Sequence, residues 1–206
     1  MLDIDFNNMK KFKTFLFLNC LFLLLSSTTC TEEPNFYTKI IEVENAISID
    51  NKDSYVVNDV VYINALFSRY LPENGFDNIL DIYKTTQSNK YTFNFYLDKK
   101  NSENIWLNVD FLNNLIIEKG EINFENNTNN YNTNDQFAIC VLNNLTNQYE
   151  FRAGITILET GEYRLRVLRK LIPKTLNNNI NLEIETTINN LEIQEEMYVN
   201  YMFSVN

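Results

Sequence analysis

The chain contains no histidine, and this absence excludes several classes of catalytic site at once. Ser-His-Asp and Cys-His nucleophilic sites, HExxH zinc sites and histidine proton relays all depend on the imidazole ring. Glycine is almost as scarce, and the four glycines are Gly75, Gly120, Gly154 and Gly161. They form neither a P-loop nor a GxGxxG fingerprint, so nucleotide chemistry is not expected. We therefore predict a protein without a metal centre or a cofactor.

Basic residues are also few. The full chain carries 17 basic and 27 acidic residues, a formal net charge of −10. Loss of residues 1–29, described below as a signal peptide, removes three lysines and two aspartates and leaves 14 basic and 25 acidic residues, a net charge of −11. Such a charge repels phosphate backbones, so nucleic acid is not expected as a partner. Solubility is the simplest role for the excess of acidic residues.

The N-terminal region contains a long apolar run with the features of a secretory signal peptide. Three lysines lie within residues 10–13, an apolar core spans residues 12–25, and small polar residues then lead to Cys30. A basic start, an apolar core and a small-residue end define such signals, whereas a transmembrane helix needs about 20 apolar residues. Two aspartates upstream of Met9 spoil the basic start, so we expect Met9 to be the first residue of the signal.

The end of this segment resembles the signal of a bacterial lipoprotein, in which the cysteine after the cleavage site becomes the acylated N-terminus. The usual consensus has Leu three residues before that cysteine and Gly, Ala or Ser directly before it. Ser27 and Thr29 occupy those positions before Cys30. Looser boxes of this kind are similar to those of Bacteroidota lipoproteins, and the resemblance implies that Cys30 is lipidated.

Two acidic residues that follow the cysteine, Glu32 and Glu33, are similar to the tag that directs many lipoproteins of that phylum to the cell surface. The resemblance implies a membrane partner through the lipid anchor, at the outer membrane or the cell surface. A free secreted or periplasmic protein is the alternative. Residues 30–38 would then form a tether of at most about 30 Å, between the signal peptide and a domain over residues 39–206.

Cys140 has no cysteine partner once the other two cysteines are assigned. Cys20 lies within the signal peptide, and Cys30 would carry lipid. Residues 137–141 form an apolar run around Cys140, which favours a small buried hydrophobic side chain over a reactive nucleophile.

Period-two alternation of apolar and polar residues is the strongest structural signal of the mature chain. Ten segments show it or are compatible with it: 39–49, 55–67, 78–83, 91–97, 104–111, 136–142, 151–157, 163–167, 180–188 and 199–205. No amphipathic helix is expected. Strands with one wet and one buried face are typical of antiparallel sheets. The sequence therefore predicts an all-β fold, a single antiparallel β-sandwich in one domain.

The segment 159–165, ETGEYRL, resembles the D-x-G-x-Y-x-C corner of immunoglobulin-like domains. The resemblance implies that Gly161 takes a positive φ and that the Tyr163 hydroxyl bonds back to the backbone of the corner. Glu159 replaces the Asp and Leu165 replaces the Cys, so no disulfide joins two sheets here. A short hairpin turn followed by an ordinary strand is the alternative.

Residues 119–135 are rich in asparagine and poor in apolar side chains, which predicts a loop. Such a loop could recognise a ligand at one end of the sandwich, but base composition explains it more simply. The cluster at 132–135 offers oxygen atoms for Ca²⁺ without the spacing of an EF-hand, so no metal is predicted.

Trp106 is the only tryptophan, and alternation places it on one strand face with Asn108 and Asp110. If the apolar residues between them face the core, the indole points outward beside an amide and a carboxylate. That arrangement can stack against a sugar ring, so these three residues are the predicted ligand-binding site. The alternative is that another segment covers the indole, as is usual for tryptophan.

Other candidate sites are weaker. Residues 70–76 form a turn flanked by aromatic side chains, which suits either a binding rim or a loop that closes one end of the sandwich. Glu183 and Glu185 share a strand face, and Glu195 and Glu196 are adjacent. Paired carboxylates can perform acid and base steps in glycoside hydrolysis, but they also serve as solvated strand edges.

These observations favour an envelope-anchored, non-enzymatic module for binding or assembly, with a glycan or an envelope protein as its possible partner. A carboxylate-based enzyme that acts on polysaccharide is the alternative. A purely structural envelope subunit is a third hypothesis, which predicts a sizeable exposed apolar patch.

Overall fold

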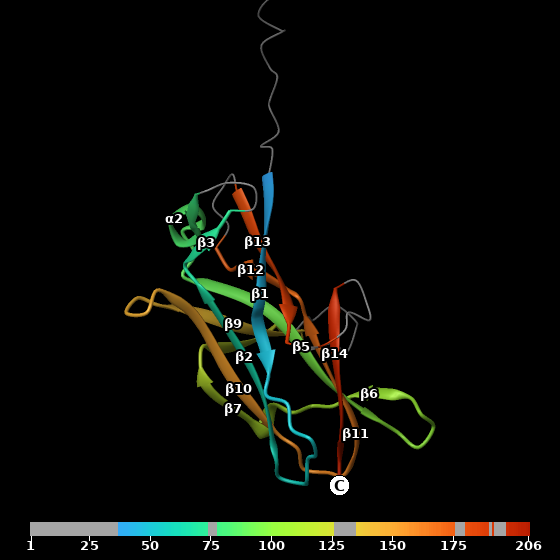
Figure 1. Cartoon of the computed structure of the whole chain (residues 1–206). Coiled ribbons are helices and arrows are strands. Elements are labelled where there is room, and N and C mark those ends of the chain that lie inside the picture. Colours follow the sequence, from blue (N-terminus) through green and yellow to red (C-terminus); the bar gives the residue numbers. More distant parts are fainter. Residues whose placement is uncertain (1–36, 74–77, 126–134, 176–179, 190, 192–196) are drawn as a thin grey trace, which may run out of the picture. The chain divides into compact units, whose positions relative to one another are not determined.

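In the computed structural model, β-strands form most of the described part of the chain (Figure 1). The described residues are 37–73, 78–125, 135–175, 180–189, 191 and 197–206. The signal segment, Cys30 and the tether up to residue 36 lie outside the described residues. Among the described residues, no helix has the length and apolarity needed to cross a bilayer.

The fold is all-β, as predicted. The described residues form fourteen strands, one five-residue helix and one 3₁₀ turn. In chain order these are β1 (Tyr37–Ile49), β2 (Val60–Ser68), β3 (Tyr70–Pro72), β4 (Ile79–Asp81), α2 (Ile82–Thr86), β5 (Lys90–Lys100), β6 (Trp106–Asn108), η1 (Leu112–Asn114), β7 (Leu115–Lys119), β8 (Glu121–Glu125), β9 (Asp135–Asn143), β10 (Gln148–Thr156), β11 (Gly161–Leu168), β12 (Lys170–Pro173), β13 (Ile180–Ile188) and β14 (Tyr198–Val205).

Seven of these strands pair edge to edge into a closed barrel. Their order is β1-β2-β10-β9-β5-β12-β13, and β13 pairs with β1 to complete the ring. The β1–β13 ladder is parallel, and the other ladders between the described strands are antiparallel. The predicted two-sheet antiparallel sandwich is therefore wrong in its layout. Alternation along a strand identifies its buried face but not the strand that meets its edge.

Strand β5 belongs both to the ring and to a second set of strands. Its first half pairs with β9 and β12, and its second half pairs with β11 and β6. Strand β14 pairs with β11, so β6, β5, β11 and β14 form a sheet that branches from the ring (Figure 1). The predicted alternation holds through both halves, because Tyr91, Phe93, Phe95 and Leu97 are all buried.

A single residue, Arg169, separates β11 from β12 and marks the branch point. Its N–H donates to the Met197 carbonyl at 3.0 Å, next to β14, and its carbonyl accepts from the Thr186 N–H of β13 at 2.8 Å. The neighbour of this chain segment thus changes from β14 to β13 within one residue. Strand β12 is absent from the sequence prediction.

Aromatic side chains fill the interior of the ring. Phe67 stacks on Tyr149 with 5.0 Å between ring centroids, and Tyr91 meets both rings edge-on. Cys140 lies in β9 beside this group and is fully buried. Burial raises the pKa of the Cys140 thiol. The predicted burial of Cys140 is confirmed, and its lack of reactivity stays a prediction.

Two segments differ from their predictions in secondary structure. Residues 78–83 form not one strand but the short strand β4 followed by α2, because the Asp81 side chain accepts the Lys84 N–H and caps a helix there. The predicted loop at 119–135 is wrong at its start, where β8 pairs with β9. Gly120 allows the chain to enter β8, because its φ is +77° and a Cβ atom would lie 2.4 Å from the Ile139 carbonyl oxygen. Residues 126–134 of that loop lie outside the described residues.

The corner at residues 159–165 has the local geometry that the motif predicts. Gly161 has a φ of +143°, and the Tyr163 hydroxyl donates to the Glu159 carbonyl at 3.0 Å. Those two expectations are confirmed. The wider resemblance to immunoglobulin-like domains stays a prediction, since the surrounding strands belong to a branched closed ring.

Candidate functional site: a cationic and aromatic sheet face

Charged and aromatic side chains collect on one face of the β6-β5-β11-β14 sheet, opposite the buried face. We name this set the arginine face. Its members are Trp106 from β6, Tyr96, Asp98 and Lys100 from β5, Arg164 and Arg166 from β11, and Tyr198 from β14. Cross-strand register brings them together, because Arg164 pairs with Asp98 and Arg166 with Tyr96.

Asp98 is at the centre of the face and accepts hydrogen bonds from both arginines. Arg164 donates to Asp98 Oδ2 through Nε at 3.0 Å and Nη2 at 2.8 Å. Arg166 donates through Nε to Oδ2 at 2.7 Å and through Nη2 to Oδ1 at 3.2 Å. The Asp98 side chain is only 3% exposed, whereas the two arginine side chains retain 22% and 27% exposure. One buried carboxylate is therefore shared by two solvent-accessible cations.

The electrostatics favour the ionised form of this group. Burial alone would raise the pKa of Asp98, but hydrogen bonds from Arg166 and Arg164 outweigh it and hold that pKa below its usual value. For Arg166, burial acts to lower the pKa, and the hydrogen bonds to Asp98 reverse that effect and raise it. Asp98 and Arg166 are thus charged at neutral pH, and arginine side chains in general keep their charge in proteins. Lys100 is matched by Glu162 of β11 at 2.8 Å, so the face has one positive charge in excess, which comes from two arginines against one aspartate.

The aromatic rings of the face hold the arginines in place. The Arg164 guanidinium lies 4.9 Å from the Trp106 ring centroid, and the Arg166 guanidinium lies 5.0 Å from that of Tyr96. The Tyr198 ring centroid also lies near Arg166, at 5.9 Å, and is 6.2 Å from that of Tyr96. Stacking orients a guanidinium while leaving donors at its edge accessible. The contacts to Asp98 use Nε and Nη2, so the Nη1 donors are not committed to this carboxylate.

The predicted site residues are only partly brought together. Trp106 and Asn108 share the face of β6, and Trp106 is half-buried with Lys100 and Arg164 over its ring. Asn108 is exposed and pairs with Asp98 across the strands. Asp110 lies beyond the end of β6, where its carboxylate accepts the Leu112 N–H at 3.1 Å in a turn. The indole is therefore partly covered, by cations of the neighbouring strands.

Sequence reasoning missed Asp98, Arg164 and Arg166 as site residues. A signal for the arginines is present, because residues two apart on a predicted strand share a face. The position of Asp98 between them depends on the pairing of β5 with β11. That pairing cannot be inferred from either strand alone.

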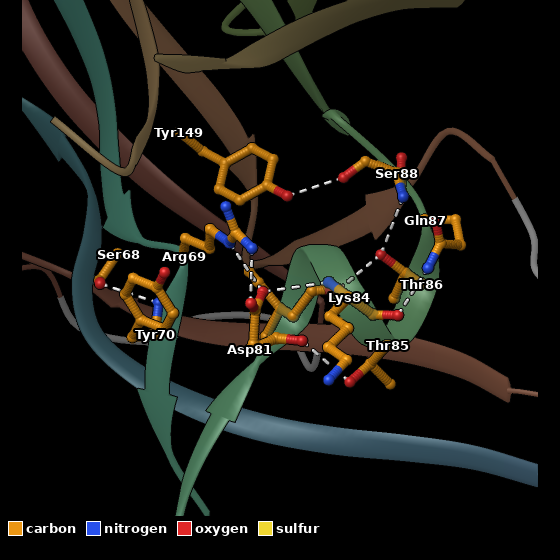
Figure 2. Close-up of polar contacts among 11 residues, drawn as sticks. Ser68, Arg69, Tyr70, Asp81, Lys84, Thr85, Thr86, Gln87, Ser88 and Tyr149 are labelled. Atoms are coloured by element: carbon orange, nitrogen blue, oxygen red, sulfur yellow. Dashed lines mark hydrogen bonds and ion pairs between the residues drawn. The ribbon is translucent and has the colours of Figure 1, made fainter. Parts of the chain in front are cut away.

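A second aspartate–arginine contact lies in a region that we name the cap, which consists of β3, β4 and α2 (Figure 2). Arg69 donates to Asp81 Oδ1 through Nε at 2.8 Å and to Oδ2 through Nη2 at 2.6 Å. Asp81 also accepts the Lys84 N–H, and the Ile82 N–H donates to the Arg69 carbonyl at 3.0 Å. Hydrogen bonding from Arg69, opposed by partial burial, lowers the pKa of Asp81. Here one carboxylate matches one guanidinium, and both serve the local fold.

Residues 70–72 of the predicted turn form strand β3 of the cap, and Glu73 directly follows it. Residues 74–77, including the second aromatic of that segment, lie outside the described residues. Tyr149 of β10 contacts the segment between α2 and β5, because its hydroxyl donates to the Ser88 carbonyl at 2.7 Å (Figure 2).

A pocket of about 240 Å³ lies at the branch point beside Arg169. Its polar lining includes Glu42, Glu44 and Glu185, and Arg169 Nε is buried without a hydrogen-bond partner in the described part of the chain. Three carboxylates around one guanidinium give this pocket no excess of positive charge. It therefore differs in sign from the arginine face.

Of the two predicted carboxylate pairs, the structure describes only Glu183 and Glu185. Lys170 Nζ lies 2.7 Å from Glu183 and 3.9 Å from Glu185, so both carboxylates neighbour a lysine. No group of three or more Asp, Glu or Cys side chains is arranged to hold a metal ion in the parts described. Glu195 and Glu196 lie outside those parts.

Comparison with protein-family models, with curated proteins and with solved structures found no match to this chain. The arginine face is consequently assigned as the candidate site on its geometry and charge alone.

Proposed function

We propose that this chain is an envelope-anchored, non-enzymatic binding module that uses the arginine face to hold an acidic glycan. The observation that carries the proposal is the sharing of the single carboxylate of Asp98 by Arg164 and Arg166. An excess cation on a strongly acidic protein is a local reversal of sign, and such a reversal favours an anionic ligand.

The chemistry of the face fits a uronic acid better than a neutral sugar. The Nη1 donors of the two arginines suit the planar, two-oxygen geometry of a carboxylate. The aromatic side chains beside them, Trp106, Tyr96 and Tyr198, offer apolar surface for the C–H face of a sugar ring. Asn108 lies within the same face and supplies an exposed amide for sugar hydroxyl groups.

Binding to polygalacturonate, measured by calorimetry against its methyl-esterified form, tests this proposal. The esterified polymer has the same sugar ring without the charge, so it serves as the matched ligand control. We expect binding to the acidic polymer only, weakened by added salt because the attraction is between partly exposed charges. Equal binding to both polymers, or to neither, would rule out an anionic-glycan site.

A matched pair of variants localises the site. Arg166→Gln is expected to weaken binding about tenfold, since a charge-assisted hydrogen bond contributes ~1.5–3 kcal/mol. Arg152→Gln is the control, because Arg152 also stacks on a tyrosine (Tyr62, 4.2 Å) but contacts two carboxylates, those of Asp50 and Glu118, so it provides no excess positive charge. Equal losses in the two variants would place the binding elsewhere.

The anchor is tested separately by the mass of the N-terminal peptide of the chain isolated from bacterial membranes. We expect an acylated Cys30 as the first residue, supported by the lipoprotein-like signal that precedes it. Incorporation of a fatty-acid label should disappear in Cys30→Ala. A mature N-terminus without lipid would favour the secreted or periplasmic alternative.

A further inference from the structure

The β3–β4 hairpin of the cap exposes apolar side chains on one face. Strand pairing sets Pro72 opposite Ile79 and Tyr70 opposite Asp81, so Tyr70, Pro72 and Ile79 share that face with Asp81, whose carboxylate is paired with Arg69. Ile79 is 73% exposed and Tyr70 is 45% exposed, and Pro72 is also exposed. We name these three residues the hairpin face. Apolar residues that gather on one exposed face, unlike those scattered singly, make that face a candidate contact surface.

The core and an ion pair hold the hairpin face in place. Leu71, which points the other way, is only 3% exposed and belongs to the core. The bidentate contact between Arg69 and Asp81 ties the start of β3 to the end of β4, and the Tyr70 N–H donates to Ser68 Oγ at 2.9 Å (Figure 2). The backbone that carries the three apolar side chains is therefore already fixed, so binding to a surface costs little further loss of backbone entropy.

The hairpin face lies beside the point where the chain enters the domain. Strand β1 begins at Tyr37, and two residues later the Lys39 ammonium forms an ion pair with Glu73, which directly follows β3. From Cys30 to Tyr37 the chain makes seven steps, which span at most about 25 Å. A lipid on Cys30 would keep this end of the domain within that distance of the bilayer surface.

The charge around the hairpin face also suits a phospholipid surface. Lys39 is paired with Glu73 and Arg69 with Asp81, so these acidic groups are neutralised. Lys84 is exposed and forms no ion pair with any described residue. Among the described residues of the cap, the acidic groups are therefore paired and Lys84 adds a positive charge, which favours contact with anionic headgroups.

We propose that Tyr70, Pro72 and Ile79 insert into the headgroup region of the bilayer beside the lipid anchor. The proposal rests on the proposed lipidation of Cys30. Tyrosine favours the membrane–water interface, and proline and isoleucine add apolar surface. Three side chains alone bind a bilayer weakly, but the anchor raises their local concentration so that weak contact becomes stable contact. The docked hairpin fixes the orientation of the domain and leaves its other surfaces in water.

Tryptophan fluorescence in the full, processed chain tests this contact. The chain is purified from membranes and reconstituted into phosphatidylcholine vesicles that contain phosphatidylglycerol, with or without dibrominated phosphatidylcholine. Trp106→Phe removes the native signal, and Ile79→Trp places a reporter on the hairpin face. The matched control is Val56→Trp in the same background, because Val56 is also exposed (55%) but lies in the loop between β1 and β2, at the other end of β1.

We expect the Ile79→Trp emission to shift to shorter wavelength in vesicles and to be quenched by the brominated lipid, while Val56→Trp changes little. Equal quenching of the two reporters would overturn the proposal. A short-wavelength Ile79→Trp emission in detergent without vesicles, together with dimers in sedimentation, would overturn it in favour of a second copy of the chain.

Failure of the anchor and failure of the docking are distinguishable. If the mass of the N-terminal peptide shows no lipid, the soluble chain is titrated with the same vesicles at high lipid concentration. Ile79→Ser should then weaken vesicle binding on the order of tenfold, whereas Val56→Ser leaves it unchanged. Absence of any vesicle binding by the unlipidated chain would overturn the docking as well as the anchor.

Discussion

The chain uses an aspartate–arginine contact twice, with different ratios of charge. In the cap, Asp81 accepts from one arginine, Arg69, and also caps α2. On the arginine face, Asp98 accepts from both Arg164 and Arg166. The cap contact is neutral and joins two strands to a helix. On the arginine face, two arginines share one carboxylate, so one positive charge is left without a negative partner. The same chemistry therefore serves structure in one region and is available for recognition in the other.

The two aspartates also differ in burial. The Asp81 side chain is 22% exposed, whereas that of Asp98 is 3% exposed. Water can replace a lost partner in the cap but has little access to Asp98. The two regions should therefore respond differently to removal of the carboxylate and to removal of an arginine, and the predictions below use that difference.

The largest effect is expected for Asp98→Ala. It leaves two guanidinium groups side by side with no carboxylate between them, and loss of one partner from a buried ion pair costs about 3–5 kcal/mol. Since both arginines retain access to water, we expect the lower end, about 3 kcal/mol of unfolding free energy, measured by urea denaturation. A loss below that of Asp81→Ala would mean that solvent already screens the arginine pair.

A smaller loss is expected for Asp81→Ala, in the cap. The variant removes a helix N-cap, worth about 1 kcal/mol, and a partly exposed ion pair that contributes about 0.2–1 kcal/mol. We expect a total of about 1–2 kcal/mol in the same urea experiment. Asp81→Asn keeps an N-cap side chain, so it should recover roughly half of the loss. No recovery would assign the whole effect to the contact with Arg69.

The sequence predicts the strands better than it predicts their pairing. Alternation locates β10, β11, β13 and β14 to within a few residues, because one face of each strand packs against the core. It does not reveal that β5 is shared between two sheets or that Arg169 divides β11 from β12. Those features depend on which edges meet, and edges carry no periodic signal.

The cap and the arginine face show the same limit. Asp81 is a typical helix N-cap residue, but five helical residues are too few to show a 3.6-residue period. Trp106 draws attention because it is unique, yet its neighbours on the site come from β5 and β11 rather than from its own strand. Composition and spacing identify candidate side chains, whereas cross-strand register decides which of them meet.

The pH dependence of stability should separate the regions further. The folded-state pKa values of Asp98 and Asp81 are both lowered, so each contributes stability that is fully present above the unfolded pKa of about 4 and is lost as pH falls through the folded value. We expect the stability gap between the wild type and Asp98→Asn to narrow as pH falls below about 4. The gap for Asp81→Asn should narrow in the same window from a smaller starting value. A gap for Asp98→Asn that stays constant down to strong acid would contradict a titrating Asp98.

The smallest effect on stability is expected for Arg164→Ala. It converts the two-to-one cluster into a one-to-one contact between Asp98 and Arg166, which resembles the cap. Loss of the stacking on Trp106 and of the hydrogen bonds to Asp98 is opposed by relief of the repulsion between two cations. Arg166 still compensates the carboxylate, so we expect a change within about 0.5 kcal/mol. Arg69→Ala should lower the urea midpoint more, because it leaves Asp81 without its cation.

The same two variants should reverse their order in ligand binding. Arg164→Ala removes the excess positive charge and is expected to abolish most of the salt-sensitive binding to polygalacturonate, while Arg69→Ala leaves it unchanged. A large loss of stability in Arg164→Ala would show that both arginines are needed to compensate Asp98. The second cation would then belong to the fold, as Arg69 does, and the difference between the two regions would be one of burial rather than of function.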